Sequence, residues 1–320
     1  MPVEILVHRQ KAAESTTLEA AFGLMEGLSA PELQSPSSAA RFSEPLTKLE
    51  TPIYIVHPER SIRGMALGYV AQEDAYQITC MFPSAPDDWQ LVLEFAAALA
   101  VHLESRITIL SSSEAGTTTR ETFAAEEVQK FDWRADVLMG LKAMREAFDD
   151  DDIHGAPLTL PGLYRDMNIT EEAFAEIENA TDPIAAWGAW TRAAQYPDAL
   201  ISEPRFYRST GDGRVVGVYL VAADVAVVLP RKMPHLPTKF MASKELAGEK
   251  ITWKVMVVSE LSPTAEHVEA SLADFMAVVP EAHFRELDAF DSILEALPAQ
   301  TLLSYGRLAA ERATKEQTLS

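Results

Sequence analysis

The chain has 320 residues, of which 48% are hydrophobic, and its 48 acidic and 27 basic side chains give a formal net charge of −21. This apolar content is enough for a sizeable core and excludes disorder of the whole chain. The single cysteine, Cys80, excludes an internal disulfide, and the negative charge argues against nucleic acid as a partner because a phosphate backbone would be repelled.

Residues 1–120 show the clearest pattern of elements. Periodicity predicts, in chain order, a strand at 3–8, a helix at 17–28, a loop or linker at 29–50, a hairpin strand at 64–70, a strand at 76–82, a helix at 89–103 and a strand at 107–110. Ser84 and Asp87 have capping-box spacing at the start of the long helix. Its only histidine, His102, is expected in the core. This first half is therefore predicted to contain a hairpin and a split β-α-β unit.

No segment has the character of a membrane or secretion signal. Residues 1–10 lack a long apolar region, and the longest apolar run, residues 95–101, is far shorter than the roughly 20 residues that cross a bilayer. We therefore expect a cytoplasmic protein with no membrane partner.

Residues 121–200 form an acidic, helical segment. Between positions 121 and 182 there are 16 acidic and five basic side chains. Helices are predicted over residues 131–148, 171–178 and from Pro183 onwards, and Trp187 and Trp190 are expected in the core. Such a surface matches a basic protein partner in charge, although acidity that serves only solubility explains the same composition. The hypothetical partner-binding residues are Asp149, Asp150, Asp151, Asp152, Glu171, Glu172, Glu176 and Glu178.

The run of four aspartates raises the question of a metal site. Hard cations bind several carboxylate oxygens, but the glycine of a calcium-binding loop is missing and the twelfth position from Asp149 is Leu160. His154 stands beside the run, where nearby carboxylates would raise its pKa. The histidines show no metal-binding spacing, so we predict no metal and no cofactor.

Residues 201–310 are expected to repeat the pattern of the first half. Strands are predicted at 215–221, 225–229 and 251–258, a helix at 262–279 that begins at Ser262 and Pro263, and a strand at 284–289. Gly211 and Gly213 lie between strand-like residues, which indicates a hairpin turn and not a phosphate loop. The polar residues 311–320 are expected to form a flexible tail.

Positive charge gathers at one place in this half. Arg231, Lys232, His235 and Lys239 alternate with prolines in a connection between two predicted strands. Three interpretations stay open: a loop that protects a sheet edge, a contact with the acidic region of a second copy, or an anion-binding loop. The last would give an enzyme that acts on a small anionic substrate at a cleft between the halves, with His154, Arg231, Lys232, His235 and Lys239 at its site.

Several short motifs carry a resemblance to a known family. These are Asp88-Trp89, Leu160-Pro161-Gly162, Gly217-x-Tyr219, Leu229-Pro230 and Trp253-Lys254-Val255. Together they resemble an uncharacterised bacterial family of about 300 to 320 residues, over residues 53–287. The resemblance implies a bacterial origin but no activity.

The sequence therefore predicts an α+β protein whose two sheet-rich halves, a possible duplication, flank a helical acidic segment. We expect a non-enzymatic interaction module that attracts a basic partner through residues 121–182, with specificity from the apolar residues among the carboxylates. The enzyme with an anionic substrate is the alternative, and a structural homo-oligomer is a third possibility.

Overall fold

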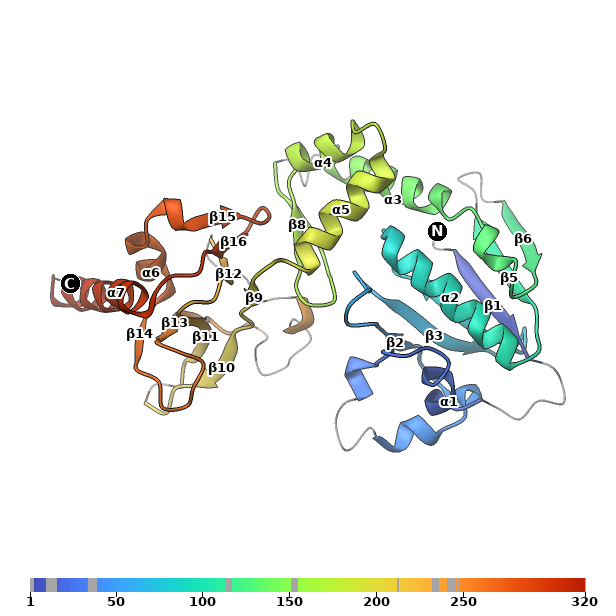
Figure 1. Ribbon diagram of the computed structural model, residues 1–320, viewed down its shortest axis with the longest axis horizontal. Coiled ribbons are helices and arrows are strands. Elements are labelled where there is room, and N and C mark those ends of the chain that lie inside the picture. Colours follow the sequence, from blue (N-terminus) through green and yellow to red (C-terminus); the bar gives the residue numbers. More distant parts are fainter. Residues whose placement is uncertain are drawn as a thin grey trace. The chain divides into compact units, whose positions relative to one another are not determined.

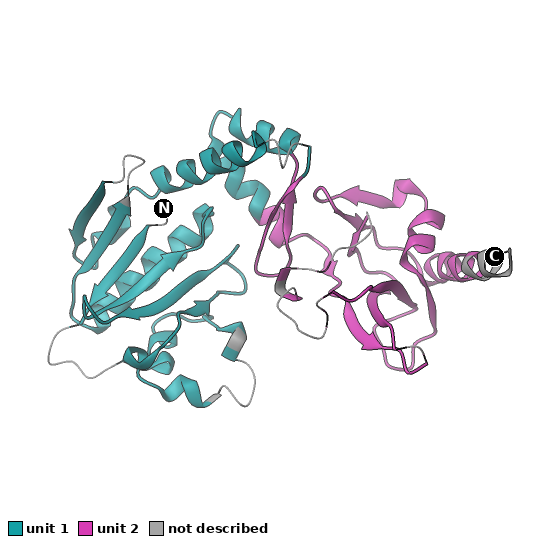
Figure 2. Ribbon diagram, turned by 180° about the vertical axis from the view of Figure 1, so that it is seen from behind, with its two compact units in different colours: residues 1–156, 171–191 teal, residues 157–170, 192–320 magenta. Residues whose placement is uncertain are grey.

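The computed structural model (Figure 1) describes residues 3–9, 16–33, 39–112, 117–150, 155–211, 213–231, 236, 238–240, 246 and 248–319. The chain forms two compact units: unit 1 comprises Met1–Ala156 and Glu171–Thr191, and unit 2 comprises Pro157–Thr170 and Arg192–Ser320 (Figure 2). Residues 121–200 thus contribute to both units. Helices and strands are both abundant, which confirms the α+β class.

Unit 1 is built on a six-stranded sheet in which all neighbouring strands are antiparallel (Figure 1). In the order β2-β3-β4-β1-β5-β6, the strands are β2 (Ile53–Ile55), β3 (Met65–Val70), β4 (Ala75–Cys80), β1 (Glu4–His8), β5 (Ile107–Ser112) and β6 (Thr118–Phe123). Because β4 and β5 both pair with β1, they are parallel to each other on either side of it, and α2 connects them. This is the split β-α-β unit expected for the first half.

In the described residues of unit 1, five α-helices and four 3-10 helices accompany the sheet, although the last residues of α5 belong to unit 2. They are α1 (Leu18–Phe22), η1 (Pro31–Leu33), η2 (Ala39–Ser43), η3 (Leu46–Lys48), α2 (Pro86–His102), η4 (Val128–Lys130), α3 (Arg134–Phe148), α4 (Glu171–Glu178) and α5 (Pro183–Gln195). Three of the 3-10 helices fall in the expected loop at 29–50. Trp187 is buried, as expected for a core residue, and half-buried Trp190 stacks on its ring.

The long helix α2 covers the middle of the sheet, where it contacts β4, β1 and β5. Nine of its side chains are buried, which agrees with its nearly continuous apolar pattern. The expectation that His102 belongs to the core was wrong. His102 and its neighbour Val101 are exposed on the solvent side of the last turn of α2, whose other side, with Leu99 and Leu103, is buried.

Unit 2 contains two four-stranded sheets and a small hairpin. One sheet is β10 (Arg205–Arg208), β11 (Val215–Ala222), β13 (Thr252–Val258) and β14 (His267–Ser271); the other is β15 (Phe284–Glu286), β16 (Asp291–Leu294), β12 (Val227–Pro230) and β9 (Leu200–Ile201); the hairpin is β7 (Leu158–Leu160) and β8 (Met167–Ile169). The helices are η5 (Thr238–Phe240), α6 (Leu272–Val278), η6 (Glu281–His283) and α7 (Ala299–Leu319). The helices α6 and α7 pack on β13 and β14.

The β-α-β unit predicted at 251–289 was wrong, because β13 and β15 belong to different sheets and the element between them is not a single helix. Residues 267–271 form strand β14, and only residues 272–278 are helical, with the N-cap at Ser271. Ser262 and Pro263 lie in a turn, in which the Ala265 N–H donates to the Ser262 carbonyl at 3.1 Å. Ser-Pro is equally typical of the first positions of a β-turn. Residues 267–271 form a strand because they pair with β13, and this tertiary pairing outweighs the local preference for a helix.

Two hairpin predictions for this half have opposite outcomes. β10 and β11 pair antiparallel around residues 209–214, and Gly213 has φ +72°, so the turn around Gly211 and Gly213 is confirmed. The strands β11 and β12 belong to different sheets, so the hairpin predicted for 215–229 was wrong.

Residues 311–319, predicted as a flexible tail, continue helix α7. Across the part of the chain that the structure describes, no helix combines the length and apolar character needed to traverse a bilayer.

Candidate functional site

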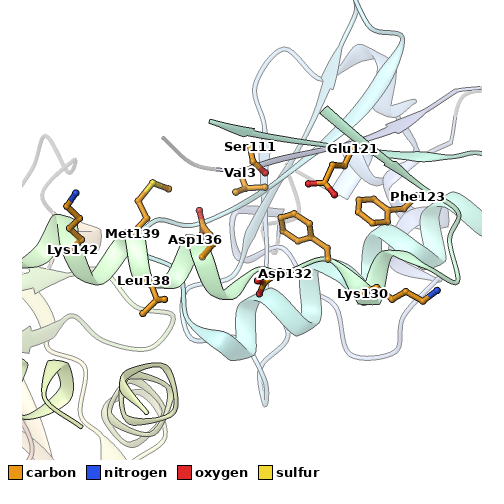
Figure 3. Close-up of a pocket in the computed structure, with 12 residues that line it drawn as sticks. Val3, Ser111, Glu121, Phe123, Lys130, Asp132, Asp136, Leu138, Met139 and Lys142 are labelled. Carbon is orange, nitrogen blue, oxygen red and sulfur yellow. The ribbon is translucent and has the colours of Figure 1, made fainter. Parts of the chain in front are cut away.

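Unit 1 contains a groove of about 730 Å³ between helix α3 and the sheet beside β6 (Figure 3). We call it the α3–β6 groove. It is lined by Val3, Ser111, Glu121, Phe123, Lys130, Phe131, Asp132, Ala135, Asp136, Leu138, Met139 and Lys142. Its volume is within the range of small-molecule sites, and its lining combines apolar side chains with a few charged ones.

The sheet supplies one wall of the groove through alternation of side chains. Glu121 and Phe123 are two residues apart on β6, so they lie on the same face of the sheet. The Phe131 ring lies between that face and α2, with its centroid 6.3 Å from the ring of Phe123 and 5.7 Å from that of Trp89. Helix α2 covers the central strands, and β6 ends the sheet. The groove is therefore the part of this face that α2 does not reach.

Helix α3 supplies the opposite wall through one of its two faces. Ala135, Leu138 and Lys142 recur at three- and four-residue spacing and face the groove. A second face, with Leu141 and Phe148, is buried. Both faces belong to the single helix predicted over residues 131–148. The structure separates them and leaves the Leu138 side chain 47% exposed.

Asp136 is the buried charged residue of the groove, at 5% exposure. Its Oδ2 accepts hydrogen bonds from Ser84 Oγ at 2.7 Å and from Trp89 Nε1 at 3.1 Å. No described residue donates to Oδ1. Burial raises the pKa of this carboxyl, while the bonds from Ser84 and Trp89 and the positive charge of the chain's N-terminus act in the opposite direction. Asp136 thus keeps one acceptor that no described side chain uses.

The environment of Asp136 also corrects the predicted capping box. The N-cap of α2 is Ala85, which has no side-chain capping bond, and Ser84 is fully buried against Asp136. The Ser84 carbonyl in turn accepts from the indole N–H of Trp187 at 2.9 Å. Ser84 Oγ also accepts from the nearby Trp89 indole N–H at 2.9 Å. Local spacing did not reveal this role because the other two partners, Asp136 and Trp187, are 52 and 103 residues away.

A second buried carboxylate, Asp88, lies in the first turn of α2. Its Oδ1 accepts from the N–H groups of Ile62 and Gly64, and its Oδ2 from the N–H of Arg63, each at 3.0 Å. Desolvation raises the pKa of Asp88 to about 7, against the opposing effect of these three bonds. Asp88 therefore fastens the loop before β3 to the helix.

The predicted acidic partner surface is only partly within the described residues. Asp149 is the C-cap of α3, and Asp150 is exposed beside it. Asp151 and Asp152 lie outside the described part. Glu171 and Glu178 form ion pairs with Arg145 at 3.2 and 2.8 Å. On α4, Glu172 and Glu176 are exposed. Within the described ranges, no three histidine, cysteine or acidic side chains are grouped as metal ligands.

The predicted anion-binding residues are mostly outside the described chain, which leaves that prediction untested. His154, Lys232 and His235 are not described, and Lys239 is described only in its backbone, within η5. Arg231 is exposed and forms an ion pair with Glu281.

Unit 2 has its own buried polar cluster, which the sequence analysis missed. The Arg165 guanidinium donates to the Ala194 carbonyl at 3.1 Å and to the carboxylates of Asp288 and Asp291. The Asp288 carboxylate also accepts from the backbone N–H of Asn168 at 3.1 Å. These bonds tie the β7–β8 hairpin to the turn before β16, which gives the cluster a structural role.

Comparison with known proteins adds a family but no activity. The family model described as a domain of unknown function (DUF4299) matches residues 3–304, which is most of the chain. No curated protein and no solved structure matches the chain. The α3–β6 groove and the acidic residues around it must therefore be interpreted from their own chemistry.

Proposed function

The chain belongs to the DUF4299 family, whose function is unknown, and we propose from the chemistry of unit 1 that it is an interaction module. In this proposal the α3–β6 groove binds a segment of a partner protein that carries apolar and basic side chains. The observation that supports it is a groove beside α2 that is lined by apolar and aromatic side chains and contains three carboxylates.

The apolar part of the groove accounts for affinity. Phe123, Phe131, Leu138 and Met139 line it, and burying apolar surface contributes roughly 25 cal/mol per Å². Aromatic and methionine side chains are enriched at the centres of protein interfaces. The exposed Leu138 shows that the groove opens at the surface, where a partner segment can enter.

The charged residues of the groove account for the positive charge expected on the partner segment. Glu121, Asp132 and Asp136 are acidic, and the two lysines of the groove lie near other carboxylates. Lys130 Nζ is 3.5 Å from a Glu127 oxygen, and Lys142 Nζ is 4.0 Å from a Glu146 oxygen. With a net charge of −21, the chain also attracts basic partners at long range.

Site-specific photo-cross-linking tests this proposal. A photoreactive phenylalanine replaces Leu138, in the groove, or Val101, which is 68% exposed on α2 and does not line it. After irradiation in a lysate of the native host, we expect a cross-linked peptide from position 138 that is rich in lysine or arginine and apolar residues. Its yield should fall when Glu121 and Asp132 are replaced by lysine.

Three outcomes would contradict the proposal. These are equal cross-linking from position 101, a cross-linked segment without basic residues, and a yield that the two charge reversals leave unchanged. Both reversals are at exposed positions, so their effect on folding should be small.

A further inference from the structure

One wall of the α3–β6 groove contains a hydrogen-bond acceptor that lacks a described donor. Asp136 is 95% buried, its Oδ2 is occupied by Ser84 and Trp89, and its Oδ1 receives no hydrogen bond from the described residues. A buried carboxylate oxygen loses its hydrogen bonds to solvent. Without a donor in the protein this desolvation is not compensated, which costs free energy. A bound group that donates to Oδ1 would remove this cost.

We propose that Asp136 Oδ1 binds the ammonium group of a lysine side chain on the partner segment. This inference rests on the proposed function, because it identifies how the bound segment is anchored. It makes Asp136 the residue that selects the partner, while the apolar lining supplies contact area.

A cation suits this position better than a neutral donor. The carboxylate lies among apolar side chains, where a charge-assisted hydrogen bond is stronger than a neutral one. Glu121 and Asp132 line the same groove and add negative charge, whereas Lys130 and Lys142 are next to Glu127 and Glu146.

Lysine fits the available acceptor better than arginine. The guanidinium group binds carboxylates most strongly in a bidentate arrangement that uses both oxygens. In Asp136 one oxygen already accepts two hydrogen bonds, so a single acceptor is left for a compact donor such as an ammonium group. The four-carbon lysine stem would lie along the apolar lining of the groove near Asp136.

Access to Oδ1 requires a small rearrangement, because less than 1 Å² of this atom is exposed. Met139 follows Asp136 by three residues on α3 and lines the same groove. Its unbranched side chain adapts readily to new neighbours, which makes it the side chain best placed to move aside.

Three probes that differ only in their polar end test the inference. They are 4-phenylbutylamine, 4-phenylbutylguanidine and 4-phenyl-1-butanol, each with a ring for the apolar groove and a lysine-length chain. Dissociation constants are measured by NMR titration of the Leu138 and Met139 methyl groups. For the wild-type protein we expect the amine to bind about tenfold or more tightly than the alcohol, and more tightly than the guanidine.

Two substitutions locate the effect. Asp136→Asn should remove the preference for the amine and leave alcohol binding within about twofold. The control, Asp132→Asn, removes one exposed carboxylate from the same groove and should keep most of the preference, since exposed ion pairs contribute little. If D136N does not fold, the wild-type carboxyl ¹³C titration replaces it: the amine should lower the pKa of Asp136, and the alcohol should not.

Failure of this inference is distinguishable from failure of the proposed function. Equal binding of amine and alcohol, or a preference that D136N retains, overturns the lysine site but leaves the groove as a binding surface. Tighter binding of the guanidine than of the amine also overturns it. If no probe shifts the two methyl groups, the lysine site is wrong, and the cross-linking result from position 138 decides the proposed function by itself.

Discussion

Two buried aspartates near the start of α2 have the same chemistry and different surroundings. Asp88 has its two oxygens occupied by three backbone N–H groups, whereas Asp136 has one oxygen occupied by two side chains and the other without a described donor. Only Asp136 lines the α3–β6 groove, whereas Asp88 fastens a loop. Burial of a charged side chain therefore does not by itself indicate a binding site, and the feature that distinguishes Asp136 is an acceptor without a described donor beside a groove.

The strongest test of this contrast is Asp88→Ala. The substitution leaves the N–H groups of Ile62, Arg63 and Gly64 buried without an acceptor, and we expect the free energy of unfolding to fall by about 3 to 5 kcal/mol. Urea denaturation monitored by fluorescence measures it. The control is Glu94→Ala on the same helix, which removes a surface ion pair with Arg60 and should cost less than about 1 kcal/mol. Equal losses of unfolding free energy in the two variants would show that the hydrogen bonds to Asp88 do not stabilise the protein more than a surface ion pair does.

The pH dependence of stability gives a second test. The pKa of Asp88 is about 7 in the folded protein, because of desolvation, and about 3.9 in an unfolded chain. Between these values the folded protein binds the additional proton, so the contribution of Asp88 to stability is present below pH 4 and is lost as the pH rises through 7. The difference in unfolding free energy between wild type and D88N should therefore decrease from pH 4 to pH 7. A constant or increasing difference would contradict this assignment.

Ser84→Ala perturbs Asp136 and not Asp88. It removes one of the two donors to Oδ2 while Trp89 still donates, so we expect a loss of about 1 to 2 kcal/mol in unfolding free energy. Because the lost bond favours the ionised carboxylate, the pKa of Asp136 should rise, as seen in its ¹³C titration. In a D136N background the loss should be smaller. The same loss in both backgrounds would mean that Ser84 stabilises the protein by another route.

Local sequence pattern predicted unit 1 better than unit 2. The elements around α2 follow from alternation and helical spacing over contiguous residues. Strand β14 does not, because it is held by β13 and packs against α7, whose Gly306 approaches Val268. A helix nearly 40 residues downstream decides that segment, and a single-sequence periodicity does not reveal such a neighbour.

The sequence indicated only the negative charge of the region that contains the candidate site. The acidic segment at 121–182 contains Glu121, Asp132 and Asp136 of the groove, but none of the eight residues predicted to bind a partner is among its described lining residues. The distinction between Asp88 and Asp136 depends on residues distant in sequence. The motifs behind the family resemblance prove equally structural. Trp89 contacts Phe131, and Gly217 lies against the Trp253 ring, where an added Cβ would come within 2.5 Å. The packing roles of these positions agree with a resemblance that identified a family and no activity.

Leu138→Ala should have the smallest effect on stability of the substitutions considered. It also distinguishes the groove most clearly from the Asp88 contacts that fasten the loop before β3. The Leu138 side chain is 47% exposed, so its truncation should change the unfolding free energy by less than about 0.5 kcal/mol. The same truncation removes apolar area from the groove wall and should weaken binding of 4-phenyl-1-butanol by about two- to fivefold. Val101→Ala, at 68% exposure outside the groove, should change neither quantity. If L138A binds the alcohol as wild type does, Leu138 contributes nothing to the groove, and the unmet acceptor of Asp136 would have to be explained without an apolar ligand.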